Sequence, residues 1–139
     1  DGQHPPEEMP KLLAPWREGA DLVLGTRDHL YAAMGYVRRA SNGTSSWMIS
    51  HVAGAQLPDC QTGYRLYAKR LIETIGFPEP RFEAESAVLV RAVRAGFKVV
   101  GVPVRLDKAD GRATSHYRPI VDSLRIAGAV ARARFEAAS

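Results

Sequence analysis

The sequence has only one cysteine and lacks any long hydrophobic run. Because Cys60 is the only cysteine, an internal disulfide and a zinc site built from cysteines are excluded. No stretch approaches the roughly 18 apolar residues that a membrane-spanning helix needs, and no signal peptide is recognisable. The 139 residues are 45% hydrophobic and 24% charged, which is typical of a folded domain. We therefore expect a single domain over residues 1–139 in a reducing, cytoplasmic setting.

The net charge of +4 is distributed unevenly along the chain. Residues 1–26 hold two basic and five acidic side chains, whereas residues 105–139 hold seven basic and four acidic ones. The acidic start suits a bound cation, and the basic remainder suits phosphate groups or an anionic surface. A solvated, mildly basic surface explains the same composition, so composition alone leaves both interpretations open.

The hydrophobic pattern predicts alternating helices and strands, and therefore an α/β fold with a small mixed sheet flanked by helices. Short apolar runs predict strands over residues 20–25, 63–68 and 98–104. Helical spacing predicts a short helix ending by Gly19 and longer helices over residues 30–54, 69–75, 83–95 and 118–136.

Two details of the predicted helices are specific enough to check. Turn-forming residues at 41–46 suggest an interruption of the 30–54 helix. In the 118–136 helix, apolar side chains share one face while charged side chains share the other, so the apolar face is expected to pack inward. That apolar face comprises Ile120, Leu124, Ala127, Ala131 and Phe135.

Five motifs follow one another in a consistent order. They are DGQHPPE at 1–7, DLVLGTR at 21–27, DCQTGYR at 59–65, FEAE at 82–85 followed by AGFKV and VPV, and SHYR at 115–118. Together they resemble glycosyltransferase family 2, in the branch of polyprenyl-phosphate sugar transferases similar to dolichyl-phosphate mannose synthase.

The resemblance implies a GT-A fold, a Rossmann-like sheet that binds a sugar nucleotide. It implies that this chain is the C-terminal, acceptor-side portion, with the nucleotide-binding half preceding Asp1, so the isolated chain is not expected to catalyse. The implied reaction is an inverting, metal-dependent transfer of a sugar from a nucleotide-sugar donor to a polyprenyl phosphate or similar acceptor. We expect it at the cytoplasmic face of a membrane.

The resemblance makes Asp1 the second aspartate of a D-x-D motif and Gln3 a nearby metal ligand. Carboxylate and amide oxygens suit Mg²⁺ or Mn²⁺. Such a cation stabilises the diphosphate leaving group as it gains charge. On the residues alone, Asp1 and Gln3 equally fit an exposed chain terminus.

Arginines are the candidates for binding phosphate, because the guanidinium fork forms two parallel hydrogen bonds with it. Arg27 follows a predicted strand end, where open α/β sheets bind ligands, and the resemblance assigns it to the acceptor phosphate. Arg39 matches by approximate position, and a solvated helix face is its alternative. Ser115 and Arg118 lie in a polar loop that would close over the diphosphate.

Asp59 is the candidate catalytic residue. A carboxylate acts as general base when the acceptor is a hydroxyl, but a phosphate acceptor is already anionic near neutral pH. Asp59 would then position the acceptor or Arg65, and capping the turn before the next strand is its structural alternative. Arg65 is a further substrate-binding candidate, with a structural ion pair as its alternative.

Two positions depart from the family pattern. His116 follows Ser115 where the family has a lysine or arginine, so the charge there depends on pH. Gly101 stands where the family often has a glutamate, which weakens any acid role for that strand.

A second class of function is a small, non-catalytic basic module that binds anionic lipid or nucleic acid. The basic residues are not interleaved with aromatic residues as a stacking surface requires, so we expect no nucleic-acid partner. Trp47 in the 30–54 helix and the basic face of the 118–136 helix are candidates for peripheral contact with a membrane surface. Packing of both helices on the sheet is the alternative.

Overall fold

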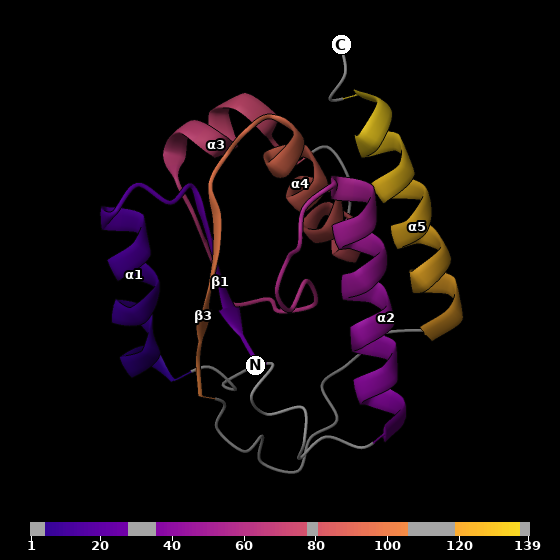
Figure 1. Ribbon diagram of the computed structural model, residues 1–139, viewed down its shortest axis with the longest axis horizontal. Helices are drawn as coiled ribbons and strands as arrows, with labels where there is room; N and C mark the ends of the chain where they lie inside the picture. The colour runs from indigo at the N-terminus through magenta and orange to yellow at the C-terminus, as the bar shows by residue number, and fades with distance from the viewer. Residues whose placement is uncertain (1–4, 28–35, 78–80, 106–118, 137–139) are drawn as a thin grey trace.

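The structure is a computed structural model that describes residues 5–27, 36–77, 81–105 and 119–136; for residues 36–39, 41–42, 81–82, 119–124 and 136 it describes the backbone alone. Over these ranges the chain forms a three-stranded sheet with helices on both faces, as Figure 1 shows. The expected α/β class with a small mixed sheet is confirmed.

The central strand of the sheet is β1 (Leu22–Thr26). It pairs antiparallel with β2 (Arg65–Tyr67) on one side and parallel with β3 (Val99–Pro103) on the other. All five residues of β1 are buried, because helices cover both faces of the sheet, and this explains an apolar run without polar alternation. Strands form in all three predicted segments, but β1 is shifted to end one residue later than expected, β2 is half the expected length and β3 is one residue shorter at each end.

The helices divide between the two faces of the sheet. In Figure 1, α1 lies on one side, whereas α2, α4 and α5 lie on the other. Over the described ranges the helical segments are a short 3₁₀ turn η1 (Pro6–Glu8), α1 (Met9–Arg17), α2 (Tyr36–Ala53), α3 (Lys69–Ile75), α4 (Arg81–Arg94) and α5 (Pro119–Glu136).

Apolar side chains fill both spaces between sheet and helices. On the α1 side, Leu12 packs with Val23 of β1 and with Val104. On the other side, Leu22 and Leu24 of β1 join a larger cluster with side chains of α2, α3, α4 and α5. Successive residues of β1 thus serve opposite cores, as strand geometry requires.

Glycines follow the helix ends where the sequence predicts them. Gly19 follows α1 with φ of 90° and Gly96 follows α4 with φ of 79°. This left-handed conformation is favourable for glycine and strained for other residues. The predicted stops of these two helices are therefore confirmed.

The expected interruption of α2 at residues 41–46 is wrong, because the helix runs unbroken from residue 36 to residue 53. Two of its hydroxyl groups form hydrogen bonds that do not interrupt the helix. Thr44 Oγ1 donates to the Ala40 carbonyl at 2.9 Å, within the helix. Ser46 Oγ accepts from the backbone N–H of Cys60 at 3.0 Å, so this hydroxyl supports a tertiary contact instead of a turn.

The expected inward face of α5 is also wrong. Phe135 is 74% exposed, Ala131 is exposed and Ala127 is half-buried, whereas the residues that enter the core are Ile126, Ala129, Val130 and Ala133. Helical spacing fits both sets. Packing against α4 buries the set that includes Ala129 and Ala133, whose small side chains allow two helix axes to approach closely. Ile120 and Leu124 lie in the part of α5 whose side chains are not described.

Candidate functional site

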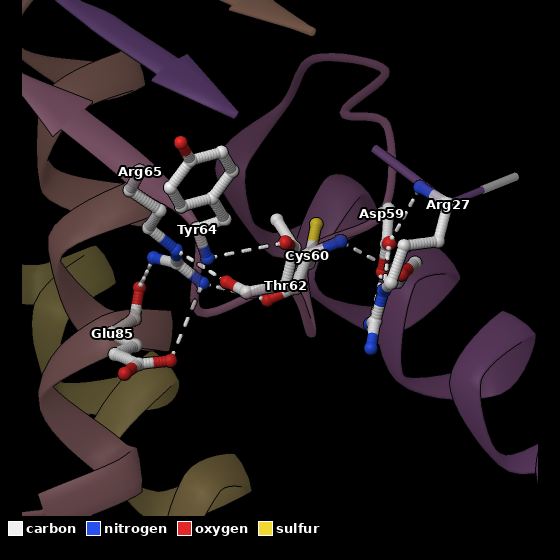
Figure 2. A network of polar contacts seen from close by, with 8 residues as sticks. Arg27, Asp59, Cys60, Thr62, Tyr64, Arg65 and Glu85 are labelled. Carbon is white, nitrogen blue, oxygen red and sulfur yellow. Dashed lines mark hydrogen bonds and ion pairs between the residues drawn. The ribbon is translucent and has the colours of Figure 1, made fainter. Parts of the chain in front are cut away.

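A buried ion pair lies at the carboxyl end of β1. Arg27 directly follows the strand, and Asp59 lies in the loop between α2 and β2. Arg27 Nε donates to Asp59 Oδ2 at 2.7 Å and Nη2 donates to Oδ1 at 2.9 Å, while the Arg27 backbone N–H reaches Oδ2 at 3.0 Å (Figure 2). The side chains are 13% and 0% exposed respectively. The two sequence candidates thus form one unit.

The pairing limits what Asp59 can do. Both of its carboxylate oxygens accept hydrogen bonds from Arg27, which favours the ionised form of the carboxyl group. This geometry suits a residue that orients Arg27. The sequence motifs predicted a positioning role toward the acceptor or Arg65, and the structure identifies Arg27 as the residue that Asp59 holds.

Two serines of α2 hold the loop that carries Asp59. Ser50 Oγ accepts from the Leu57 backbone N–H at 3.0 Å, and Ser46 Oγ accepts from the Cys60 N–H at 3.0 Å. The serines are four residues apart and lie one turn apart on the same helix face. Neither serine was predicted from the sequence, because the partner of a hydroxyl on a helix face depends on where the fold places the following loop.

Gly101 of β3 makes room for the same loop. A Cβ atom at this position would lie 2.5 Å from Pro58 Cγ and 2.8 Å from Thr26 Cγ2. Pro58 immediately precedes Asp59, and Thr26 immediately precedes Arg27. The absence of the family's glutamate at this position therefore has a steric reason in this chain, because any side chain would displace both neighbours of the ion pair.

Arg65 has a structural role in this arrangement, because its side chain binds the backbone of neighbouring segments. Its Nε, Nη1 and Nη2 atoms donate to the backbone carbonyls of Thr62, Glu85 and Cys60 at 2.7, 2.6 and 2.9 Å (Figure 2). A carboxylate oxygen of Glu85 lies 3.7 Å from Nη2, and the Arg65 side chain is 2% exposed. It joins the Asp59 loop to α4, and this geometry gives no support to the substrate-binding role considered from sequence.

Cys60 directly follows Asp59, and its backbone carbonyl accepts a hydrogen bond from Arg65. Its side chain is buried. Desolvation raises the pKa of its thiol to about 11, against a smaller opposing effect of the Ser46 hydroxyl. The thiol is therefore neutral near neutral pH and unsuited to nucleophilic chemistry.

A second buried carboxylate, Glu8, lies at the start of α1. Glu8 accepts from Lys11 Nζ at 2.6 Å, from the Arg105 backbone N–H at 2.9 Å and from Arg105 Nε at 3.0 Å. These hydrogen bonds, led by that from Lys11, lower the pKa of Glu8 to about 2. No local signal identifies this contact, because Arg105 is 97 residues away in the sequence.

The remaining predicted site residues cannot be placed beside the ion pair. Asp1, Gln3, Ser115 and Arg118 lie outside the described residues, as does His116. Arg39 lies in α2, in the part where the backbone alone is described. Across the described ranges, no three His, Cys, Asp or Glu side chains gather as metal ligands. None of the helices in those ranges has the length and hydropathy needed to cross a lipid bilayer.

The described part of the site is an arginine–carboxylate pair at one edge of the sheet. Arg27 is held at the carboxyl end of a central strand, where α/β sheets bind ligands, and Asp59 balances its charge. Because Asp59 and its loop already hold the guanidinium, little side-chain freedom would be lost if a ligand bound to it.

Three similar proteins are named as sugar-transferring enzymes. Polyprenol monophosphomannose synthase of Mycolicibacterium smegmatis is 31% identical over 113 residues, which cover 75% of this chain and 42% of that protein. Dolichyl-phosphate hexose transferase of Haloferax volcanii is 30% identical over 105 residues, covering 75% and 46% respectively. Glycosyltransferase AglJ of the same organism is 26% identical over 124 residues, covering 88% and 41%.

No family model and no solved structure matches the chain. The chain spans less than half the length of each of these relatives. The fold and the site define an α/β protein with a buried arginine–carboxylate pair at a strand end. The chain is a relative of family 2 glycosyltransferases, and the resemblance expected from its motifs is confirmed.

Proposed function

We propose that the natural protein carrying this sequence transfers a sugar from a nucleotide-sugar donor to polyprenyl phosphate or a similar lipid phosphate. The observation that supports this proposal best is the Arg27–Asp59 pair, a buried, preoriented guanidinium at the end of β1. Two similar proteins are named for polyprenol or dolichyl phosphate, which is the class of acceptor that such an arginine would hold.

In the proposed step, an acceptor phosphate oxygen attacks the anomeric carbon of the donor sugar. The new bond joins this carbon to the phosphate oxygen, while the bond between the carbon and the nucleoside diphosphate breaks with its electron pair. One displacement inverts the anomeric configuration. Because the attacking phosphate is already anionic near neutral pH, the step needs no general base. Asp59 then keeps Arg27 oriented toward the phosphate.

The proposal includes a divalent cation. Asp1 and Gln3 would hold Mg²⁺ or Mn²⁺ through oxygen ligands, and the cation would neutralise charge on the departing diphosphate. Ser115 and Arg118 would contact the same diphosphate. The reaction would take place at the cytoplasmic face of a membrane, where a lipid phosphate is accessible.

The test uses the natural protein, a panel of radiolabelled nucleotide sugars with Mn²⁺, and polyprenyl phosphate in detergent. We expect label from one donor to enter the lipid phase only when the phosphorylated lipid is present. The anomeric configuration of the product, read by NMR, tests inversion. Equal transfer to unphosphorylated polyprenol, or no transfer from any donor, would contradict the proposed acceptor.

A further inference from the structure

Helix α2 binds the loop that carries Asp59 on both sides of this residue. Two residues before Asp59, the Leu57 N–H donates to Ser50 Oγ at 3.0 Å, and the same hydroxyl donates to the Leu57 carbonyl at 3.3 Å. One residue after Asp59, the Cys60 N–H donates to Ser46 Oγ at 3.0 Å. The loop is therefore attached to α2 at two points, and Asp59 lies between them.

Most backbone donors of this segment bond to the two serines. Within residues 57–60, Pro58 has no N–H, and two of the three remaining donors bond to serine hydroxyls of α2. The Cys60 carbonyl accepts from Arg65 Nη2 at 2.9 Å (Figure 2). The backbone of Cys60 is thus bound to α2 on one side and to β2 on the other, so the loop cannot shift without breaking one of these contacts.

The packing of α2 determines where the two hydroxyls lie. Ser46 and Ser50 are four residues apart, so they lie one turn apart on the same helix face. Ile49, next to Ser50, is fully buried in the core, which fixes the rotation of α2 about its axis. A serine oxygen is separated from the helix backbone by one rotatable bond, so its position follows the helix closely.

Asp59 passes the position of the loop on to Arg27. Its two carboxylate oxygens accept from Nε and Nη2 of Arg27 at 2.7 and 2.9 Å, and two parallel hydrogen bonds fix the plane of the guanidinium as well as its distance. A shift of the loop therefore changes the direction in which Arg27 points. Displacing a positioning group by about 1 Å can cost up to about a hundredfold in rate.

We propose that Ser46 and Ser50 are positioning residues for the acceptor phosphate. They hold the Asp59 loop against α2, and Asp59 in turn keeps the guanidinium of Arg27 directed toward the phosphate. This inference rests on the proposed function. The two can fail separately, because an unmodified protein that transfers no sugar contradicts the proposed function, whereas an active enzyme whose acceptor kinetics ignore both serines contradicts this inference alone.

The experiment measures the steady-state kinetics of the natural protein with polyprenyl phosphate in detergent and a radiolabelled nucleotide sugar that supports transfer. Ser46→Ala and Ser50→Ala should each raise the KM for the lipid phosphate about threefold, and the double variant about tenfold, because the loop loses its hydrogen bonds to α2. The KM for the donor should change less than about twofold, since the serines act on Arg27 alone. An unchanged acceptor KM in the double variant would overturn the proposal.

Two control variants separate positioning from a general effect on the helix or on stability. Thr44→Val removes a hydroxyl of α2 that donates to the Ala40 carbonyl within the helix, and it should leave the acceptor KM unchanged. Leu71→Val shortens a fully buried side chain of α3 and lowers stability. Helix α3 follows the end of β2 that pairs with Leu22, whereas Arg27 follows the other end of β1.

Leu71→Val should therefore leave the acceptor KM unchanged at a temperature where every variant is folded, as urea unfolding verifies. If Leu71→Val raises the acceptor KM as much as the serine variants of equal stability do, the serines act only through stability and the proposal is wrong.

The decisive measurement places the serine substitutions in an Arg27→Lys background. Lysine has no planar fork to be oriented, so the double serine variant should raise the acceptor KM less than about twofold beyond the effect of Arg27→Lys itself. Serines with a purely structural role would act independently of Arg27. Effects on the acceptor KM that multiply fully in the combined variant would therefore overturn the proposal.

Discussion

Arg27 and Asp59 are 32 residues apart in sequence, and their contact determines what each of them can do. Asp59 is fully buried and accepts three hydrogen bonds from Arg27, one from its backbone and two from its side chain. Without Arg27 it would be a buried charge without its main compensation, so the two residues depend on each other for stability.

Arg27→Ala in the natural protein should raise the KM for the lipid phosphate by about tenfold to a hundredfold, because charge-assisted hydrogen bonds to a phosphate are lost. The KM for the donor should change little. Steady-state kinetics with each substrate varied in turn measures this split. Arg27→Lys keeps the charge without the fork and should give an intermediate effect. A change confined to the donor KM would mean that Arg27 contacts the donor.

The same pair should behave as a unit in stability measurements. Arg27→Ala should lower the free energy of unfolding by about 3–5 kcal/mol, since Asp59 remains charged and buried. Adding Asp59→Ala should recover part of this loss. Urea unfolding of the two single variants and the double variant gives the coupling energy, and additive losses would show that the contact is weak.

Asp1→Ala should abolish sugar transfer by the natural protein while leaving its thermal unfolding unchanged. The expected reason is the loss of a carboxylate ligand to Mg²⁺ or Mn²⁺. Activity assays across a series of Mn²⁺ concentrations measure the effect. Full activity of this variant would remove the metal assignment from Asp1.

Among individual residues, the sequence predicted Arg27 and Asp59 as candidates but not their contact. Motifs identify residue types at set spacings, whereas the contact depends on how α2 places the following loop. Ser46, Ser50 and Pro58 lie outside or at the edge of the motifs and act through packing. Their roles could not be deduced without the positions of the helix and the neighbouring strand.

At the scale of elements, the helices and strands were predictable, and the faces they bury were less so. Local cues, such as Gly19 and Gly96, determine where helices end, and these were interpreted correctly. The inner face of α5 depends on α4, because small side chains such as Ala129 and Ala133 pack in the shared core. Periodicity within α5 alone allowed two solutions, so it could not distinguish them.

Gly101→Ala should displace the Pro58 loop and thereby the Arg27–Asp59 pair. We expect an unfolding free energy lower by about 1–3 kcal/mol, as for other overpacked sites, and a raised acceptor KM. Pro58→Ala removes the atom that the new methyl group would meet at 2.5 Å but leaves the 2.8 Å approach to Thr26 Cγ2, so the double variant should regain part of the acceptor affinity. Acceptor titrations of the single and double variants measure this recovery.

Gly63→Ala is the matched control for that series. A Cβ atom at Gly63 would meet no heavy atom within 4 Å, so the same substitution should change neither stability nor acceptor KM appreciably. If Gly101→Ala leaves the acceptor KM unchanged while lowering stability, the glycine serves packing of the sheet and does not position the ion pair.

At the scale of the whole molecule, Glu8 connects the first helical turn to the segment after β3. Its pKa is about 2 in the folded protein, against an ordinary value of 4.5. A lowered pKa in the folded state means that the stabilisation is complete above about pH 4.5 and is lost as the pH falls toward 2. Urea midpoints measured across this range should therefore fall with decreasing pH.

Glu8→Gln should remove much of this pH dependence, because the amide does not titrate. Asp21 contributes in the same direction. Burial acts to raise its pKa, but hydrogen bonds from Arg70 and from the Lys98 N–H together lower it. Asp21→Asn therefore measures the contribution of Asp21 to the pH dependence separately from that of Glu8. Glu7 is exposed, so Glu7→Gln is the control. An unchanged profile in both buried-site variants would contradict a lowered pKa of these two carboxyl groups in the folded protein.

The position of Cys60 gives the protein a built-in reporter of loop opening. It is the only cysteine of the chain, it is 1% exposed, and it directly follows Asp59. Because the thiol is buried, a thiol reagent is expected to reach its sulfur when the 57–62 loop detaches from α2. The labelling rate therefore measures how often this loop opens. Slower labelling in the presence of a phosphorylated ligand would show that the bound ligand stabilises the closed loop. This experiment does not require a measurement of enzymatic turnover.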